Sequence, residues 1–298
     1  MSLIPFYLVD VFSDQPLQGN PLALVPDAER IDDLRMRRLA REFNQSETTF
    51  LLPPTHAGAD YRLRCFTPTG QEVFGAGHNA LGAWWWLAES GRLDLGQTGR
   101  QFTQQIGDHL LPVEVICDAG RPVSVGMSQT APLFGKTYGD LTEIARALGL
   151  EVSDLDVERL SIQVVSTGTA HLLVPLRDKS AIERARPDST RLLSILQSVD
   201  GQGCYLFSLD PIRPDSTAHA RFFNPTVGIV EDAATGSAAG PLACQLVAKG
   251  VLKDGVTVVI EQGYAMGRPS LIKIAVSGSS VRVEGRGFVV AEGNLQVF

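Results

Sequence analysis

Two short stretches of the sequence place ionisable side chains beside runs of small residues. Residues 74–80 read Phe-Gly-Ala-Gly-His-Asn-Ala, with His78 as the ionisable group, and residues 231–240 read Glu-Asp-Ala-Ala-Thr-Gly-Ser-Ala-Ala-Gly. Small residues before a helix let a ligand approach the first free backbone N–H groups, where the helix dipole favours negative charge. Both stretches are therefore candidate ligand-binding sites.

Four side chains are candidates for chemistry, three of them within these stretches. Asp232 is the strongest, with helix capping as the alternative explanation. Ser237 can cap the helix or bind a ligand, because its neighbours do not match the G-x-S-x-G elbow of a nucleophilic serine. His78, at a helix start, suits a neutral imidazole in general acid/base exchange. Glu47, taken alone, is better explained as a solvated strand end.

Three other motif matches are set aside. Residues 75–80 fit G-x-G-x-x-A, but a poor Rossmann strand precedes them and no acidic strand end follows about 20 residues later. Gly135-Lys136-Thr137 lacks the earlier glycine of a P-loop. No histidine pair or carboxylate cluster has the spacing of metal ligands. We expect neither a cofactor nor a metal.

The two small-residue stretches are related by an internal repeat. Phe-Thr-Pro at 66–68 is echoed by Phe-Asn-Pro at 223–225, and further matches share a separation of 159 residues. The pattern predicts a duplicated unit, with two similar halves facing each other. The matched pairs at 159 are Gly77 with Gly236, His78 with Ser237, Ala80 with Ala239, Leu87 with Leu246, Gly91 with Gly250 and Leu93 with Leu252.

Composition narrows the class of protein. The chain has 298 residues, of which 44% are hydrophobic and 20% charged, with a net charge of −7. These values are ordinary for a soluble globular protein, and the acidic balance argues against nucleic acid or an anionic membrane as a partner. Four scattered cysteines without C-x-x-C spacing fit buried thiols in a reducing compartment. We expect a cytoplasmic protein that acts on small molecules.

Apolar patterning predicts many strands and one buried helix in each half. The strands include 47–52 and 61–66, which have β-branched content or alternation. Helices over 79–89 and 238–248 are apolar nearly all round, which is typical of helices buried on every side. The Pro-bearing segment from Gln129 marks the boundary between halves.

We therefore predict an N-terminal half over 1–128, which the last strand, 288–298, can join, and a C-terminal half over 129–287. At about 150 residues each, the halves have the size expected of domains.

In these features the chain resembles the PhzF-like (phenazine biosynthesis protein) isomerase family, within the diaminopimelate epimerase-like fold. The resemblance covers nearly the whole length. The motifs that carry it are, in chain order, Val9-Asp10-Val11-Phe12, Gly19-Asn20-Pro21, Asn44-Gln45-Ser46-Glu47-Thr48, Phe66-Thr67-Pro68, Gly75-Ala76-Gly77-His78, Ser166-Thr167-Gly168 and the stretch 231–240.

The resemblance implies an α+β fold of two pseudo-symmetric halves, each a largely antiparallel sheet wrapped around a central buried helix. It implies an active site in the cleft between the halves, where the helix N-termini are suited to bind a substrate carboxylate. It also suggests a homodimer.

The resemblance further implies roles for particular residues. Glu47 would be the proton-transferring acid/base, which reverses the interpretation of that residue taken alone. His78, Asp232 and Ser237 would assist, and the backbones of Gly77 and Gly236 would help to bind the substrate. Further substrate contacts are expected from three residues, Asn20, Ser46 and Thr235.

Some positions depart from related sequences. Ala76 and Ala234 stand where the two-base racemases of this superfamily carry cysteines, so a two-thiol racemase is excluded. Asn79 and Ala233 replace prolines that are usual in the family, and Gly75 replaces a phenylalanine, so the rim of the pocket is expected to differ.

The prediction is a cofactor-independent isomerase that moves a proton within a small carboxylate-bearing, cyclic or conjugated substrate. Two alternatives stay open: a non-catalytic binding protein that retains the fold, and, ranked third, a hydrolase that uses Ser237.

Overall fold

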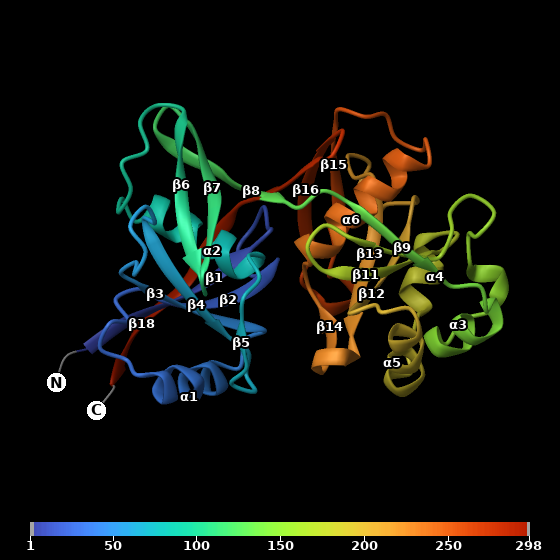
Figure 1. Ribbon diagram of the computed structural model, residues 1–298, viewed down its shortest axis with the longest axis horizontal. Helices are drawn as coiled ribbons and strands as arrows, with labels where there is room; N and C mark the ends of the chain where they lie inside the picture. The colour runs from blue at the N-terminus through green and yellow to red at the C-terminus, as the bar shows by residue number, and fades with distance from the viewer. Residues whose placement is uncertain (1–2, 297–298) are drawn as a thin grey trace. The chain divides into compact units, whose positions relative to one another are not determined.

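The computed structural model describes residues 3–296, which form two compact units. Unit 1 contains the chain up to Ser128 and the segment from Glu284 on, and unit 2 is the continuous segment Gln129–Val283. Figure 1 shows each unit as strands with helices among and beside them. Within the described residues, no helix is both long and apolar enough to span a membrane.

Unit 1 is built on one curved mixed sheet. Its strands pair in the order β18–β1–β2–β3–β4–β6–β7–β8, with β5 paired to β4. The pairs β2–β3 and β4–β6 are parallel and the others antiparallel. The elements are β1 (Leu3–Val11), β2 (Asn20–Val25), α1 (Asp33–Phe43), β3 (Glu47–Leu52), β4 (Tyr61–Phe66), β5 (Glu72–Val73), α2 (His78–Glu89), β6 (Gly99–Ile106), β7 (His109–Asp118), β8 (Arg121–Gln129) and β18 (Gly287–Gln296).

The predicted last strand, 288–298, corresponds to β18; its final two positions lie outside the described residues.

Unit 2 repeats this pattern. Its strands pair in the order β9–β10–β11–β12–β13–β15–β16, with β14 paired to β13 and with β11–β12 and β13–β15 parallel. Short 3-10 helices lie at Val152–Asp154, Pro225–Val227 and Tyr264–Met266. The other elements are β9 (Leu133–Thr137), α3 (Leu141–Leu148), β10 (Gln163–Ser166), β11 (Ala170–Pro175), α4 (Lys179–Arg184), α5 (Ser189–Ser198), β12 (Gly203–Ser208), β13 (Ala218–Asn224), β14 (Ile229–Asp232), α6 (Gly236–Ala248), β15 (Val256–Gln262), β16 (Ser270–Ser277) and β17 (Ser280–Gly285).

The two sheets correspond strand for strand. Each parallel pair of unit 1 has a parallel counterpart in unit 2, and β9 takes beside β10 the place that β18 takes beside β1. The structure therefore extends the repeat from a few matched residues to the whole pattern of strand pairing, as expected of a duplicated unit.

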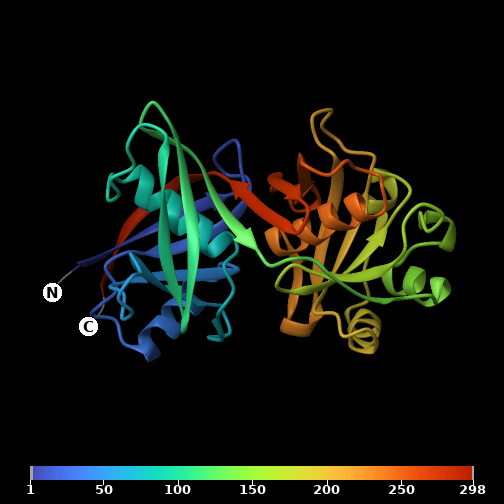
Figure 2. The same ribbon diagram turned by 45° about the horizontal axis from the view of Figure 1, so that its top comes forward.

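Each sheet surrounds one buried helix. Every residue of α2 from His78 to Ala88 is buried, and α2 contacts β1, β2 and β3 (Figures 1 and 2). Trp84 is fully buried there and donates its Nε1–H to Gln104 Oε1 at 2.9 Å, which satisfies its polar atom. Helix α6 is buried in the same way and packs on β16 and β10. The predicted α+β fold with buried central helices is confirmed.

Helix α6 begins slightly earlier than predicted. Its first residue is Gly236, so Pro241 is the sixth residue of the helix, beyond the first turn, and has no N–H to bond the Ser237 carbonyl. Thr235 occupies the N-cap position, which means that Ser237 is inside the helix and does not cap it.

Candidate active site

Unit 1 gathers predicted site residues at one edge of its sheet. Because β2 and β3 are parallel neighbours, Asn20 at the start of β2 lies on the same side as Ser46 and Glu47 at the start of β3. His78, the first residue of α2, joins them: its Nε2 lies 3.3 Å from Ser46 Oγ and its Nδ1 3.6 Å from Glu47 Oε2. Ser46 Oγ donates to Asn20 Oδ1 at 3.1 Å.

The surroundings of His78 keep its imidazole neutral. Burial lowers the pKa of His78 to about 4, because a charged ring would lose its hydration. A neutral ring has one N–H donor and one bare acceptor nitrogen. The 3.6 Å separation between His78 Nδ1 and Glu47 Oε2 exceeds a hydrogen bond. Glu47 keeps 18% of its side chain exposed and is therefore reachable by a ligand.

Cys65 lies beside this cluster and was not singled out by its place in the sequence. It is buried on β4, opposite Thr49 of β3. Burial, together with the negative charge of nearby Glu47, raises the pKa of the Cys65 thiol well above its usual range. The thiol therefore stays protonated and is a poor nucleophile.

The loop before α2 is held by Asn79, one of the residues that depart from the family pattern. Asn79 Oδ1 accepts a hydrogen bond from the Gly77 N–H at 2.7 Å, and its Nδ2 donates to the Gly75 carbonyl at 2.9 Å. Two side-chain hydrogen bonds thus fix the loop where a proline would fix it through its ring. They also occupy the Gly77 N–H that was predicted to help bind the substrate.

A paired arginine and glutamate anchor the strand before this loop. Arg64 on β4 forms two hydrogen bonds to Glu72 on β5, both at 2.7 Å, and its guanidinium lies 4.9 Å from the centre of the Phe66 ring. This bidentate geometry fixes β5 against β4. We call it the unit 1 clamp.

Unit 2 contains the same arginine–glutamate pair, with the arginine 157 and the glutamate 159 residues later in the chain. Arg221 on β13 forms two hydrogen bonds of 2.8 Å to Glu231 on β14, and its guanidinium lies 4.9 Å from the centre of the Phe223 ring. Arg221 also donates to the carbonyls of Ile182 and Ala185. In this unit 2 clamp both oxygens of the Glu231 carboxylate are bound by the arginine.

Asp232 is supported by a chain of buried polar groups. Thr235 Oγ1 donates to Asp232 Oδ2 at 2.6 Å and accepts from Gln262 Nε2 at 3.1 Å. Gln262 also donates to the Asp232 carbonyl at 2.8 Å, and its Oε1 accepts from the Thr235 N–H and from Tyr205. Since the N–H and hydroxyl of Thr235 are both engaged, its observed contacts are those of a support for Asp232.

Gln129 holds the start of α6 and explains a glycine there. Its Nε2 donates to the Gly236 carbonyl at 2.9 Å, and its Oε1 accepts from Thr167 Oγ1 at 2.7 Å. A Cβ on Gly240 would collide with the Gln129 side chain. Glycine at 240 therefore opens the space in which Gln129 lies.

Ser237, in the first turn of α6, has a histidine partner that the sequence did not reveal. His171 on β11 places its Nε2 3.2 Å from Ser237 Oγ. The only hint in the sequence is a histidine at the start of an otherwise apolar strand, in Ala170-His171-Leu172-Leu173-Val174.

The two units differ where Glu47 stands. Glu47 is paired with β2, and the next residue, Thr48, stands opposite Phe66 of β4. In unit 2 the equivalent position is Gly203: it is paired with His171 of β11, and the next residue, Cys204, stands opposite Phe223 of β13. A Cβ on Gly203 would lie 2.5 Å from the Phe222 ring. The ring thus fills the space of a side chain, and unit 2 has no counterpart to Glu47.

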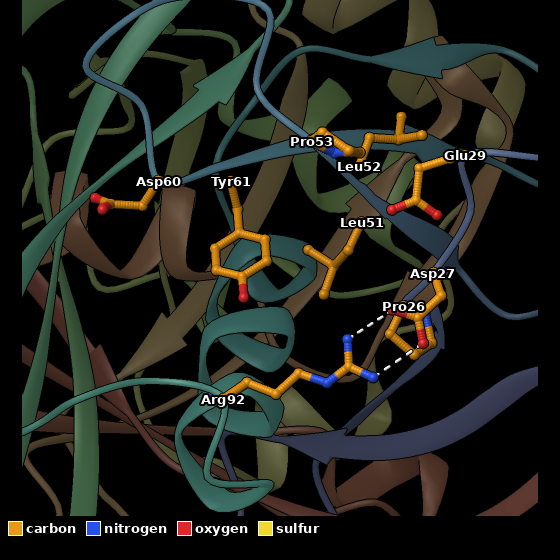
Figure 3. Close-up of a pocket in the computed structure, with 9 residues that line it drawn as sticks. All are labelled: Pro26, Asp27, Glu29, Leu51, Leu52, Pro53, Asp60, Tyr61 and Arg92. Atoms are coloured by element: carbon orange, nitrogen blue, oxygen red, sulfur yellow. Dashed lines mark hydrogen bonds and ion pairs between the residues drawn. The ribbon is translucent and has the colours of Figure 1, made fainter.

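A separate pocket lies elsewhere on unit 1. Figure 3 shows that two of its charged residues are paired: Arg92 binds both carboxylate oxygens of Asp27, at 2.7 and 2.9 Å. The pocket has a volume of about 310 Å³ and contains none of the predicted site residues. It is lined by Pro26, Asp27, Glu29, Leu51, Leu52, Pro53, Asp60, Tyr61 and Arg92.

The predicted site residues divide between the units. Unit 1 holds Asn20, Ser46, Glu47, Gly77 and His78, and unit 2 holds Asp232, Thr235, Gly236 and Ser237. Among residues 3–296, the histidine, cysteine and acidic side chains form no cluster able to hold a metal ion.

Comparison with known proteins gives matches over nearly the whole chain. The family model described as phenazine biosynthesis-like protein matches residues 9–293. The trans-2,3-dihydro-3-hydroxyanthranilate isomerase of Pseudomonas aeruginosa is 35% identical over 298 residues, which covers 97% of this chain and 98% of the relative. The uncharacterized isomerase YddE of Escherichia coli K12 is 33% identical and covers 91% of this chain and 89% of the relative.

Solved structures also match this chain over nearly its whole length. A phenazine biosynthesis protein of the PhzF family from Bacillus anthracis matches with a TM-score of 0.90 at 27% identity, with full coverage of both chains. A probable proline racemase from Agrobacterium radiobacter K84 matches with a TM-score of 0.65 at 14% identity, covering 99% of this chain and 93% of its own. The second likeness concerns the fold alone.

Proposed function

Because the chain belongs to the phenazine biosynthesis-like protein family and is an isomerase, we propose that it moves a proton within a small substrate without a cofactor. The substrate carries a carboxylate and is cyclic or conjugated. The observation that carries the proposal is the contact between Glu47, exposed enough to meet a ligand, and the neutral His78 at the first turn of α2. The isomerase of P. aeruginosa, named for a dihydro-hydroxyanthranilate, supports this substrate class.

The proposed reaction is a proton relocation in two steps. The Glu47 carboxylate takes a proton from a C–H bond next to the conjugated system, and the electron pair of that bond moves into the system. The protonated Glu47 then gives the proton to another carbon, where a new C–H bond forms. Substrate and product have the same atoms and electrons, and Glu47 returns to its starting state. A positioned acid/base of this kind contributes about 10²–10⁴-fold in rate.

The neighbours of Glu47 are assigned supporting roles. Because Ser46 donates its hydroxyl proton to Asn20, the neutral His78 ring donates its Nε2–H to Ser46, and its bare Nδ1 can accept a hydrogen bond from Glu47 once that carboxyl group has taken up the proton. Asp232 and Ser237 are proposed to hydrogen-bond the substrate.

The test is proton NMR in D₂O with trans-2,3-dihydro-3-hydroxyanthranilate and a panel of cyclic amino and hydroxy acids. The wild-type protein is compared with Glu47→Gln, which keeps the shape of the side chain but cannot accept the proton. Glu42→Gln, on the exposed side of α1, is the matched control. Deuterium entry or a shifted double bond should appear with the wild type and the control and fall by about 10²–10⁴-fold with Glu47→Gln.

Two results would overturn the proposal. Equal exchange with Glu47→Gln would assign the chemistry to another residue. Binding of a panel compound by both proteins, with no exchange in any compound, would favour the non-catalytic binding protein.

A further inference from the structure

His171 is a buried histidine that contacts a proposed substrate-binding residue from within unit 2. Its ring is 2% exposed, and its Nε2 lies 3.2 Å from Ser237 Oγ in the first turn of α6. The ring meets Phe222 edge to face, with 5.0 Å between centres and an angle of 85°. His171 and Gly203 are paired residues of neighbouring parallel strands, so the missing side chain at Gly203 leaves room for the ring. The ring is therefore held on several sides.

The second ring nitrogen decides which tautomer is present. Nδ1 is fully buried, and nothing among residues 3–296 offers it a hydrogen-bond partner. It faces the backbone of Gly203, where a Cβ would be 3.0 Å away. Buried N–H groups without a partner are rarer in proteins than under-satisfied acceptors. The favoured arrangement thus has a bare Nδ1 and a proton on Nε2.

From this arrangement we infer that His171 donates its Nε2–H to Ser237 Oγ and is a positioning residue for that serine. Because Oγ then accepts from the ring, the serine's own proton is left to donate to an oxygen of the substrate. The inference deepens the proposed function and rests on it, since it assumes that Ser237 meets the substrate.

The same geometry argues against Ser237 as a nucleophile. A nucleophilic serine needs a neighbouring base that can take its proton, and in catalytic triads a carboxylate on the far ring nitrogen stabilises the resulting imidazolium. Burial lowers the pKa of His171 to about 3, and its far nitrogen has no such carboxylate in the described chain. His171 is therefore a poor base, which disfavours the hydrolase alternative.

The kinetic test uses His171→Phe, which keeps the ring and its packing on Phe222, and His171→Gln, whose amide can replace the Nε2 donor. Loss of one neutral hydrogen bond should lower turnover of the isomerised compound by about three- to tenfold in His171→Phe. His171→Gln should recover most of this loss. Leu172→Val, on the opposite face of β11, is the control that lowers stability without touching Ser237.

A double-mutant cycle separates positioning from general loss of structure. Ser237→Ala should lower turnover more than His171→Phe does, and the double variant should be no worse than Ser237→Ala alone. Additive losses, or a Gln variant no better than the Phe variant, would overturn the inference.

A second measurement does not depend on turnover. Nitrogen NMR of ¹⁵N-labelled protein distinguishes a protonated ring nitrogen from a bare one, and the signals missing from His171→Phe identify His171. We expect a proton on Nε2 and a bare Nδ1, unchanged between about pH 5 and pH 9. A proton on Nδ1, or a ring that titrates in this range, would contradict the inference even if the proposed reaction is found. If the expected tautomer is found but no compound is isomerised, the proposed function is wrong and not the hydrogen bond assigned to His171.

Discussion

Glu47 and Gly203 hold equivalent places in the two copies of the repeated unit, and their neighbours explain the difference. Beside Glu47 stands the small side chain of Cys65, whereas the ring of Phe222 fills the equivalent space next to Gly203. A carboxylate at 203 would collide with that ring. In the proposed reaction Glu47 acts first as base and then as acid, with no partner carboxylate at the equivalent position of unit 2.

Two of the buried histidines, His78 and His171, make the stability of the protein depend on pH. Burial lowers the pKa of His78 to about 4 and of His171 to about 3, against about 6.5 in an unfolded chain. The unfolded state therefore binds more protons below pH 6.5, and the free energy of unfolding falls as the pH drops. We expect a loss of about 2 kcal/mol per histidine between about pH 7 and pH 5.

Urea denaturation at the two pH values measures this loss. His171→Phe should remove the contribution of one histidine to this loss, whereas Leu172→Val, which removes no titratable group, should leave the pH dependence unchanged. An unaltered pH dependence in His171→Phe would contradict the prediction.

Single residues were only partly predictable from the sequence. His78, Asp232 and Ser237 stood out because they lie beside small residues at a helix start. Glu47 did not, and only the family resemblance pointed to it. Cys65 and His171 carry no local motif, since it is the pairing of distant strands that brings each of them to its partner. Such contacts depend on the fold and not on spacing along the chain.

At the scale of elements, the two clamps hold short strands that would otherwise be weak. Strand β5 has two residues and β14 four, too few to be stable by backbone pairing alone. Each leads within a few residues to the N-terminus of the buried helix. We therefore interpret each arginine–glutamate pair as the anchor that sets where the helix-start loop begins.

The unit 2 clamp should be important for stability. Arg221 is 6% exposed, so Arg221→Met would leave the Glu231 carboxylate without its partner in a half-buried place. Removal of one partner of a buried ion pair costs about 3–5 kcal/mol. Urea denaturation should show a loss of this size, together with a raised KM because the loop carrying Asp232 loses its anchor.

The control for this prediction is Arg92→Met. Arg92 makes the same bidentate contact to Asp27, but both side chains are more than a third exposed, so we expect a loss below about 1 kcal/mol. Similar losses in the two variants would mean that burial does not set the strength of the clamp.

In the loop before α2, two substitutions of Asn79 can be compared. Asn79→Ala removes two side-chain hydrogen bonds and should lower stability by about 1–3 kcal/mol and raise KM. Asn79→Pro also removes them, but position 79 lies in the first turn of α2, where proline fits a helix. It should therefore keep more stability and also free the Gly77 N–H. Equal stability of the alanine and proline variants would mean that the proline ring does not replace the two side-chain hydrogen bonds of Asn79.

The predicted elements agree with the structure where burial alternates or is complete. The strands 47–52 and 61–66 were predicted at their observed bounds. Strand β9 was missed because all five of its residues are exposed, which leaves no pattern. Strand β6 was missed because the buried residues at its end include the polar Gln104 and Gln105, which hide the alternation. Helix α4 was missed because six residues are too few to show helical periodicity.

At the scale of the whole molecule, the duplication was visible as a few matches at one separation. The structure shows why the signal is faint. The equivalent strand pairings are retained in both units, but the side chains on them have diverged, with Glu47 against Gly203 and Cys65 against Phe222. A pairing pattern tolerates many sequences, whereas a site needs particular residues, so the fold was easier to predict than the contacts within the site.

The path of the chain also sets an order of assembly. Unit 2 is one continuous segment, whereas unit 1 needs β18 to pair with β1, where Leu3 stands opposite Gln296. Contacts between residues so distant along the chain form slowly, because a long loop must close, at a cost in entropy, before the contacts stabilise the structure. On the ribosome, the strands of unit 2 emerge before β18 does. The unit that is synthesised first is therefore the last to complete its sheet.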